Sequence, residues 1–206
     1  MDSECLQVIL QNDFHTLQSN SLSFLLDVIL AASKSQSTEV FQAMIDSGWN
    51  INQSAGLTGD ALRYVRHIFT LIIPVPNSLI AFSHAAAADR YPITKWLLEH
   101  GADPNCNERA GMWTVLDLAV MHASPATVKL LIDQGAQVRN TNALLIAANY
   151  GRIDMLQVLL DSGADMHEIP DNGLSSDYEG LSAMDVAKRE NQQEAIKYLT
   201  ERDVNT

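Results

Sequence analysis

Histidine and cysteine are the residues of this chain whose types could support metal binding or nucleophilic catalysis. No two histidines show the HxxxH or HExxH spacing that places two ligands on one helix face. The cysteines, Cys5 and Cys106, form neither a CxxC pair nor a cluster with histidine. We therefore expect no metal, no cofactor, and free thiols in a reducing compartment. The histidines are His15, His67, His84, His100, His122 and His167.

Sequence motifs of known catalytic sites are also missing. The chain holds no Gly-x-Ser-x-Gly, P-loop or GxGxxG segment. A dyad of His122 with Asp117 or Asp185 stays open, because such sites are assembled in space. We assign no catalytic residue and favour a protein that is not an enzyme.

The composition indicates a folded protein with an acidic surface. Of the 206 residues, 47% are hydrophobic and 18% are charged, and the net charge is -12. This charge repels phosphate backbones, so we expect no nucleic-acid partner; it either favours a basic partner or only maintains solubility. Apolar stretches are too short to span a membrane, and the acidic N-terminus lacks the basic region of a signal peptide. We expect a cytoplasmic protein and leave nuclear entry open.

A five-residue phrase that begins with glycine recurs after pairs of large apolar residues. Clear copies occupy residues 101–105, 135–139 and 163–167, and a fainter copy occupies 48–52. Glycine just past an apolar pair is typical of the left-handed residue that ends a helix. The phrase therefore predicts an internal repeat whose unit ends with a helix and a turn.

The segment before Gly163 shows the elements of one unit. Its residues Ile153, Leu156, Leu159 and Leu160 share one face of a helix, and residues 143–148 predict a second, shorter helix. Two antiparallel helices and a turn form the unit, and they must stack on neighbours to bury their apolar faces. The polar turn residues Asp103, Asn105 and Asp165 are expected to serve turn geometry.

These residues resemble the ankyrin repeat. Residues 144–165, LLIAANYGRIDMLQVLLDSGAD, match its second half, and residues 96–105, WLLEHGADPN, match its end. The resemblance extends from about Leu25 to the C-terminus. It implies an all-α solenoid of stacked helix-turn-helix pairs with short β-turn fingers. It also implies a binding module, although ankyrin arrays bind many unrelated partners.

The repeats depart from the family pattern in sequence and in spacing. None carries the full Thr-Pro-Leu-His; the nearest segments, 114–117 and 182–185, begin with a residue that can cap its helix. The intervals between the small residues Ala32, Ala85, Ala119, Ala147 and Ala187 are 53, 34, 28 and 40 residues, against a period of about 33. This spacing predicts an insertion after the first repeat, a shortened finger at 139–141, and a long finger or loose loop at 169–180.

We therefore predict one domain, residues 1–206, made of a capped and interrupted array. Its parts are an N-terminal cap helix 1–21, repeat 1 at 22–53, an inserted segment with an extra helix at 54–77, repeat 2 at 78–107, repeat 3 at 108–140, repeat 4 at 141–169, and a long finger with a C-terminal capping repeat at 170–206.

The insertion contains an apolar helical face within residues 58–76 that is ended by Pro74 and Pro76. This helix either covers the flank of a widened repeat or leaves an apolar interface exposed. The residues of the possible interface are Arg63, Arg66, His67, Ile72 and Ile73.

The resemblance places the binding surface on the concave side, at the finger tips and at the two residues that follow each small-residue position. Aromatic and methionine side chains there would anchor a partner, since these types are enriched in interface cores. The structural alternative is that Trp113 packs on its own finger and Met121 fills a gap. The candidate partner-binding residues are Arg109, Met112, Trp113, Met121, His122, Asn149, Tyr150 and Arg189.

Three functions remain open. The leading one is a monomeric, non-enzymatic scaffold or regulator that binds a protein or peptide in the concave groove. The second is a small-molecule binder or atypical enzyme with a closed pocket between residues 58–76 and the first helices, lined by His84 or His122. The third is a regulatory subunit or effector that docks on an enzyme through the inserted helix.

Overall fold

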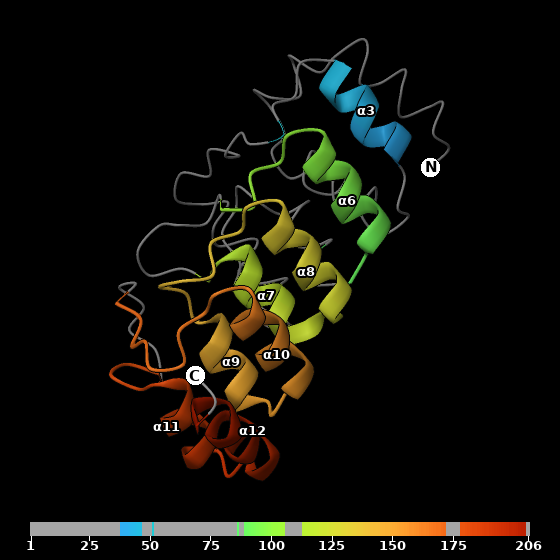
Figure 1. Ribbon diagram of the computed structural model, residues 1–206. Coiled ribbons are helices and arrows are strands. Elements are labelled where there is room, and N and C mark those ends of the chain that lie inside the picture. The colour runs from blue at the N-terminus through green and yellow to red at the C-terminus, as the bar shows by residue number, and fades with distance from the viewer. Residues whose placement is uncertain are drawn as a thin grey trace, which may run out of the picture. The chain divides into compact units, whose positions relative to one another are not determined.

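The computed structural model describes residues 38–46, 51, 86, 89–105, 113–171 and 178–204. These residues form eight α-helices and contain no strand (Figure 1). The chain divides into two compact units: Met1–Ala85 with Arg90–Asp103, and Ala86–Asp89 with Pro104–Thr206.

The first unit contains helices α3 (Thr38–Asp46) and α6 (Tyr91–Glu99). Pro92 lies at the start of α6, where a missing N–H leaves no intrahelical hydrogen bond unmade. Phe41 of α3 is fully buried, and its ring centroid lies 6.2 Å from that of Trp96 in α6. The two helices therefore contact each other through aromatic side chains.

The second unit is a stack of three helical pairs. They are α7 (Val115–His122) with α8 (Pro125–Asp133), α9 (Ala143–Asn149) with α10 (Ile153–Asp161), and α11 (Ala183–Arg189) with α12 (Gln193–Val204). Helix α9 packs on both α7 and α11, and α10 packs on both α8 and α12 (Figure 1). The first helices thus form one layer and the second helices another. This confirms the predicted all-α architecture of stacked helical pairs.

Small side chains allow the first helices to pack closely. Ala119, Ala147 and Ala187 are all fully buried in α7, α9 and α11. Larger side chains at these positions would force the helices apart, because protein interiors are close-packed.

Helix α6 and the second helices α8, α10 and α12 bury side chains at the same helical positions. Each leucine that is completely buried there contributes about 1.5–3 kcal/mol to stability. For α10 the observed core differs from the predicted face, because Met155 is fully buried while Ile153 and Leu160 are half-buried. The buried residues at the third helical position are Ile93, Thr127, Met155 and Ala195, and those at the seventh are Leu97, Leu131, Leu159 and Leu199.

The phrase glycines end their helices as the sequence predicts. Gly101, Gly135 and Gly163 have φ values of 90°, 94° and 94°. After Gly163, the N–H of Ala164 donates to the Leu159 carbonyl at 3.0 Å, as in a Schellman turn. Helix α12 has Asp203 at the equivalent position, four residues after its buried leucine, and extends to 12 residues instead of the nine of α10.

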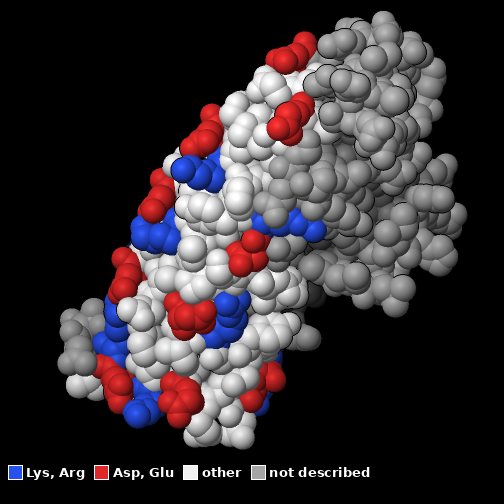
Figure 2. Space-filling view, turned by 90° about the vertical axis from the view of Figure 1, so that its right-hand side faces the viewer, with Lys and Arg blue, Asp and Glu red and all other residues white. Residues whose placement is uncertain are grey.

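The exposed sides of α6 and α8 carry pairs of oppositely charged residues. Lys95 and Glu99 are 3.8 Å apart on α6, and Lys129 pairs with Asp133 on α8. Figure 2 shows acidic and basic side chains interspersed on one face of the described residues. Exposed pairs of this kind contribute little stability, but they leave this face without a patch of a single sign.

Several predicted features lie outside the described residues. They are the N-terminal cap helix 1–21, the inserted segment 54–77 with Arg63, Arg66, His67, Ile72 and Ile73, the finger residues Arg109 and Met112, and the residues His15, His84, Cys5 and Cys106. Of the long finger at 169–180, residues 172–177 also lie outside. The predictions made for these segments stay predictions.

Candidate functional site

The ends of the first helices bring candidate binding residues into one row. Because α7 packs on α9 and α9 packs on α11, the ends of the three helices lie next to one another across three repeats. We call the residues at these ends the helix-end row. They are Met121 and His122 at the end of α7, Asn149 and the following Tyr150 at the end of α9, and Arg189 and the following Glu190 at the end of α11.

The helix-end row presents an aromatic ring and a guanidinium to solvent. Tyr150 is 54% exposed, one of four exposed large hydrophobic residues in the described part of the chain. His122 and Arg189 are exposed as well, and Met121 is half-buried. The Arg189 Nε donates to Glu190 at 2.8 Å, and its guanidinium lies 5.7 Å from the ring centroid of Tyr178, within cation–π range.

The loop that carries Tyr150 is held on both sides. The Tyr150 N–H donates to the Ile146 carbonyl at 3.0 Å, and Gln192 Nε2 donates to the Asn149 carbonyl at 2.8 Å. Gly151 has φ 63°, and a Cβ at this position would lie 2.5 Å from Gln192 Oε1. Glycine is therefore favoured here for two reasons: the backbone is left-handed, and a Cβ would force the end of the Gln192 side chain to move.

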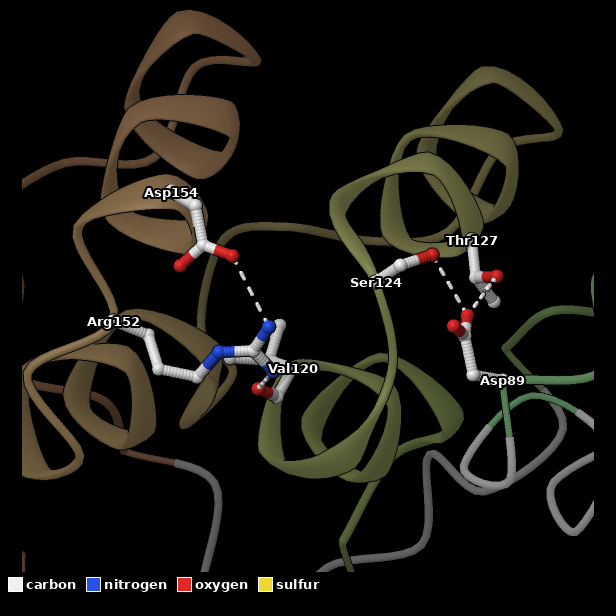
Figure 3. Close-up of polar contacts among 6 residues, drawn as sticks. All are labelled: Asp89, Val120, Ser124, Thr127, Arg152 and Asp154. Carbon is white, nitrogen blue, oxygen red and sulfur yellow. Dashed lines mark hydrogen bonds and ion pairs between the residues drawn. The ribbon is translucent and has the colours of Figure 1, made fainter.

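Hydrogen bonds from the residue before each second helix reach back to the preceding repeat. Ser124 Oγ donates to Asp89 at 2.7 Å, and an Arg152 terminal nitrogen donates to the Val120 carbonyl at 3.0 Å (Figure 3). Gln192 makes the corresponding bond to Asn149. Ser124 and Arg152 make no side-chain cap to their own helices. We call these bonds the loop contacts.

Asp89 accepts a second hydrogen bond besides the one from Ser124. Thr127 Oγ1, on a fully buried residue, also donates to Asp89 at 2.7 Å. Partial burial raises the pKa of Asp89, but the hydrogen bonds from Ser124 and Thr127 and the charge of Arg152 outweigh it, so the pKa lies below its ordinary value. The ionised form of Asp89 is thus the one that holds the loop.

A second set of hydrogen bonds joins the fingers, and we call these bonds the finger contacts. The fifth residue of each phrase contacts the first residue of the next phrase, or the position equivalent to it. Asn105 Nδ2 donates to the Gly135 carbonyl at 2.8 Å, and Arg139 Nε donates to the Gly163 carbonyl at 3.2 Å. His167 Nε2 lies 3.0 Å from a carboxylate oxygen of Asp203.

The finger contacts add a second role for Asn105 to the turn role predicted for it. Its Oδ1 accepts the Gln137 N–H at 2.8 Å, so its amide binds the next repeat with both ends. Asp165 does serve its own turn, since its carboxylate accepts the His167 N–H at 2.9 Å. The local sequence of Asn105 gives no sign of this role, but its fixed place in a repeated phrase is a signal that could have found it.

The short junction at 139–141 is filled from the following finger. Asn140 has φ 55°, and its Oδ1 accepts the Asp171 N–H at 2.8 Å. Thr141 Oγ1 donates to the Val138 carbonyl at 2.9 Å and closes the turn. Asn140 and Asp171 therefore join this junction to the following finger.

Trp113 lies apart from the helix-end row. It is half-buried and precedes α7, whereas Met121 stands near the far end of the same helix. Eight residues of helix separate them by roughly 12 Å along the axis. Of the candidate binding residues, Met121, His122 and Tyr150 therefore belong to the row, whereas Trp113 stands at the other end of α7.

The two capping boxes account for the candidate catalytic aspartates. The Thr114 N–H donates to Asp117 at 2.8 Å, and the Ser182 N–H donates to Asp185 at 3.0 Å. Asp117 is fully buried in the first turn of α7, whereas His122 is exposed in its last turn. Five residues of helix separate the two by about 140° around the axis, so they do not form a dyad.

The pKa values of the two capping-box aspartates, Asp117 and Asp185, are shifted in opposite directions. Burial raises the pKa of Asp117 to about 6, although hydrogen bonds from Thr114 and the Asn142 N–H offset part of the effect. Hydrogen bonds from Ser182 lower the pKa of Asp185, whose site is exposed and loses little hydration. Burial is the variable that separates them.

Two of the described histidines, His100 and His167, have structural contacts. His100 stacks on Trp96 with ring centroids 3.7 Å apart, and its Nδ1 lies 2.8 Å from the Trp96 carbonyl. Among the described residues, no three His, Cys, Asp or Glu side chains are grouped so that they could hold a metal ion. Within the same part of the chain, no helix has the length and apolar character needed to cross a membrane.

Comparisons with known proteins place these repeats in a family context. Residues 82–169 match the family model described as ankyrin repeats (3 copies). The chain is 31% identical over 112 residues to ankyrin repeat and SOCS box protein 6 of Homo sapiens, which covers 51% of this chain and 26% of that protein. It is 26% identical over 184 residues to the Mus musculus protein of the same name, and this match covers 86% of this chain and 43% of that protein. A putative ankyrin repeat protein of Fowlpox virus is 30% identical over 125 residues, and this match covers 59% of this chain and 15% of that protein. The chain thus spans less than half the length of these relatives.

Proposed function

Because this chain is an ankyrin-repeat protein, and such repeats are generally protein–protein interaction modules, we propose that it binds a protein or peptide partner through the helix-end row. The observation that carries the proposal is the packing of α7, α9 and α11 across three repeats, with Tyr150 54% exposed at the end of the central helix.

The chemistry of the row suits an interface core. A tyrosine supplies a large, rigid, amphipathic contact surface at low cost in side-chain entropy. Arg189 adds a guanidinium, a group enriched among the residues that dominate binding energy. Both residues flank helices whose ends are fixed by hydrogen bonds, so little ordering would be needed when a partner binds.

The class of partner follows from the mixed character of this surface. The row combines an aromatic ring, a methionine, a histidine and an Arg189–Glu190 pair. Such a surface fits a partner with apolar and hydrogen-bonding side chains better than one of a single charge. A preference for a basic partner is supported only by the net charge of -12.

Affinity purification with mass spectrometry would test this proposal. Tyr150→Ala and Arg189→Ala should each weaken capture of the partners of the tagged wild-type chain, because truncating an interface anchor costs roughly tenfold or more in affinity. Tyr91→Ala is the matched control, since Tyr91 is 39% exposed at the start of α6 and lies outside the row.

Thermal unfolding of each variant would show that the fold is retained. A partner set that survives both Tyr150→Ala and Arg189→Ala unchanged would contradict the assignment of the row. If only Tyr91→Ala loses partners, the interface lies in the first unit, which contains Tyr91.

A further inference from the structure

Asp117 is a buried carboxyl group with an incomplete set of hydrogen bonds. It is 0% exposed. One carboxylate oxygen accepts the Thr114 N–H, but the other oxygen, Oδ1, is buried without a hydrogen bond of ordinary geometry to a described residue, and the nearby Asn142 N–H only partly offsets the burial of the carboxyl group. A buried ionised carboxylate needs several donors to replace its lost hydration. Ionised Asp117 is therefore poorly compensated.

A second unsatisfied group lies at the same junction, in the next repeat. Asn142 directly precedes α9 and is 2% exposed, and its Nδ2 has no hydrogen-bond partner in the described part of the chain. Its backbone N–H is close enough to lower the pKa of Asp117. A donor of the fourth repeat and an acceptor of the third are thus both buried where α7 packs on α9.

In the described part of the chain, no charged side chain compensates Asp117 from the helices packed on α7. Helix α9 contains no charged residue, and the charged residues of α8, Lys129 and Asp133, are exposed and paired with each other. On α7 itself, His122 is exposed at the opposite end. The helix dipole favours a negative charge in the first turn, but burial outweighs it and raises the pKa of Asp117 to about 6.

We propose that Asp117 is a proton-operated latch at the junction of the third and fourth repeats, which holds α7 and α9 together most firmly when its carboxyl group is protonated. Protonation removes the uncompensated charge. Ionisation favours a local opening that lets water reach the carboxylate. The proposal concerns local stability and does not depend on the identity of any partner.

The sign of the pH dependence follows from the two states of the junction. In the opened state Asp117 has its ordinary pKa of 3.8, so the closed state binds the proton more tightly. Opening should therefore become easier as pH rises from the ordinary pKa through about 6, and should level off above it. For one such group the opening constant should rise about tenfold between pH 5 and pH 7.

Two measurements on the full wild-type chain test the latch. The first is an NMR titration of the side-chain carboxyl carbon of Asp117, which should show a midpoint near 6. The second is amide hydrogen exchange in α7 and α9, corrected for the intrinsic pH dependence of exchange. The opening constant of these amides should rise about tenfold between pH 5 and pH 7.

Asp117→Asn removes the ionisable group and keeps the shape of the side chain. Its opening constants should be nearly independent of pH over this range and lower than those of the wild type at pH 7. Asp185→Asn is the matched control, because Asp185 occupies the same capping box at an exposed site. It should leave the pH dependence of α7 and α9 unchanged.

A wild-type Asp117 carboxyl group that titrates with an ordinary aspartate midpoint would overturn the proposal. An equal pH dependence in the wild type and in Asp117→Asn would also overturn it. If Asp117→Asn does not fold, the wild-type titration decides, because that measurement needs no substitution.

Discussion

Three aspartates show how the role of one residue type depends on its surroundings. Asp117 loses its hydration and its pKa rises to about 6, whereas Asp185 gains hydrogen bonds from Ser182 at the surface and its pKa falls. The pKa of Asp89 also falls, because donors from a neighbouring helix outweigh partial burial. The sequence shows that Thr114 and Ser182 can cap the helices that contain Asp117 and Asp185, but burial is a tertiary property and decides the direction of each pKa shift.

The loop contact at Asp89 gives a prediction at the residue scale. Asp89→Ala should lower the free energy of unfolding by about 1–3 kcal/mol, because it leaves the buried Thr127 hydroxyl without its acceptor. The left-handed φ of 53° at this position adds a further cost of about 1 kcal/mol for alanine. Urea unfolding of the purified chain would measure the loss.

Two substitutions separate these contributions at Asp89. Asp89→Asn keeps an oxygen acceptor and tolerates the left-handed backbone, so it should lose less than half as much stability. Asp89→Gly removes the acceptor without the backbone strain and should fall between the two. If Asp89→Asn destabilises the chain as much as Asp89→Ala, the hydrogen bonds to Ser124 and Thr127 are not the source of the stability.

At the scale of elements, local signals in the sequence predicted the helices well. The apolar period before Gly163 predicted a helix over 153–160, and α10 occupies Ile153–Asp161. Thr114 and Ser182 cap their helices as predicted. Caps, turns and periodicity are properties of a few neighbouring residues, so they can be read without knowledge of the fold.

Contacts between elements were harder to predict. The helical period of α10 was clear from the sequence, but the face that it buries was not, because packing against α8, α9 and α12 decides that Met155 lies in the core. Asn105 binds groups 30 and 32 residues away, which its own turn does not reveal. Candidate binding residues at the helix ends could be placed in one row because they recur at a fixed position in each repeat, whereas Trp113 does not.

The tight turn between α9 and α10 gives a prediction at this scale. Gly151→Ala should lower the free energy of unfolding by about 1 kcal/mol through its left-handed φ of 63°. It should lose about 1 kcal/mol more because the new Cβ displaces Gln192 and breaks its bond to Asn149. Chemical denaturation would measure the sum.

Gly163→Ala is the matched control for this turn. Gly163 also has a left-handed φ, but a Cβ there would meet nothing within 4 Å, so only the backbone cost applies. In a Gln192→Ala background the extra loss at Gly151 should disappear. A persistent difference between the two glycine substitutions in that background would show that Gln192 is not what restricts Gly151.

At the scale of the whole array, stability depends on how strongly neighbouring repeats are coupled. The interval between Ala119 and Ala147 is only 28 residues, yet the finger contact from Arg139 to Gly163 is still made. In a stacked array each repeat contacts only its neighbours, so coupling between adjacent repeats determines whether they unfold together. Finger and loop contacts join the repeats of the second unit at opposite ends of the helical pairs.

Asn105→Ala tests this coupling, because it removes both hydrogen bonds that Asn105 makes to Gly135 and Gln137. We expect a loss of about 1–2 kcal/mol in the free energy of unfolding and a lower urea m-value, since weaker coupling broadens the transition of a repeat array. Gln137→Ala is the control, because Gln137 contributes only its backbone N–H to this contact and its side chain is exposed. It should leave both quantities nearly unchanged. If Asn105→Ala shifts the urea midpoint with an unchanged m-value, the contact adds stability without coupling the repeats. If it changes neither, Asn105 holds only its own finger.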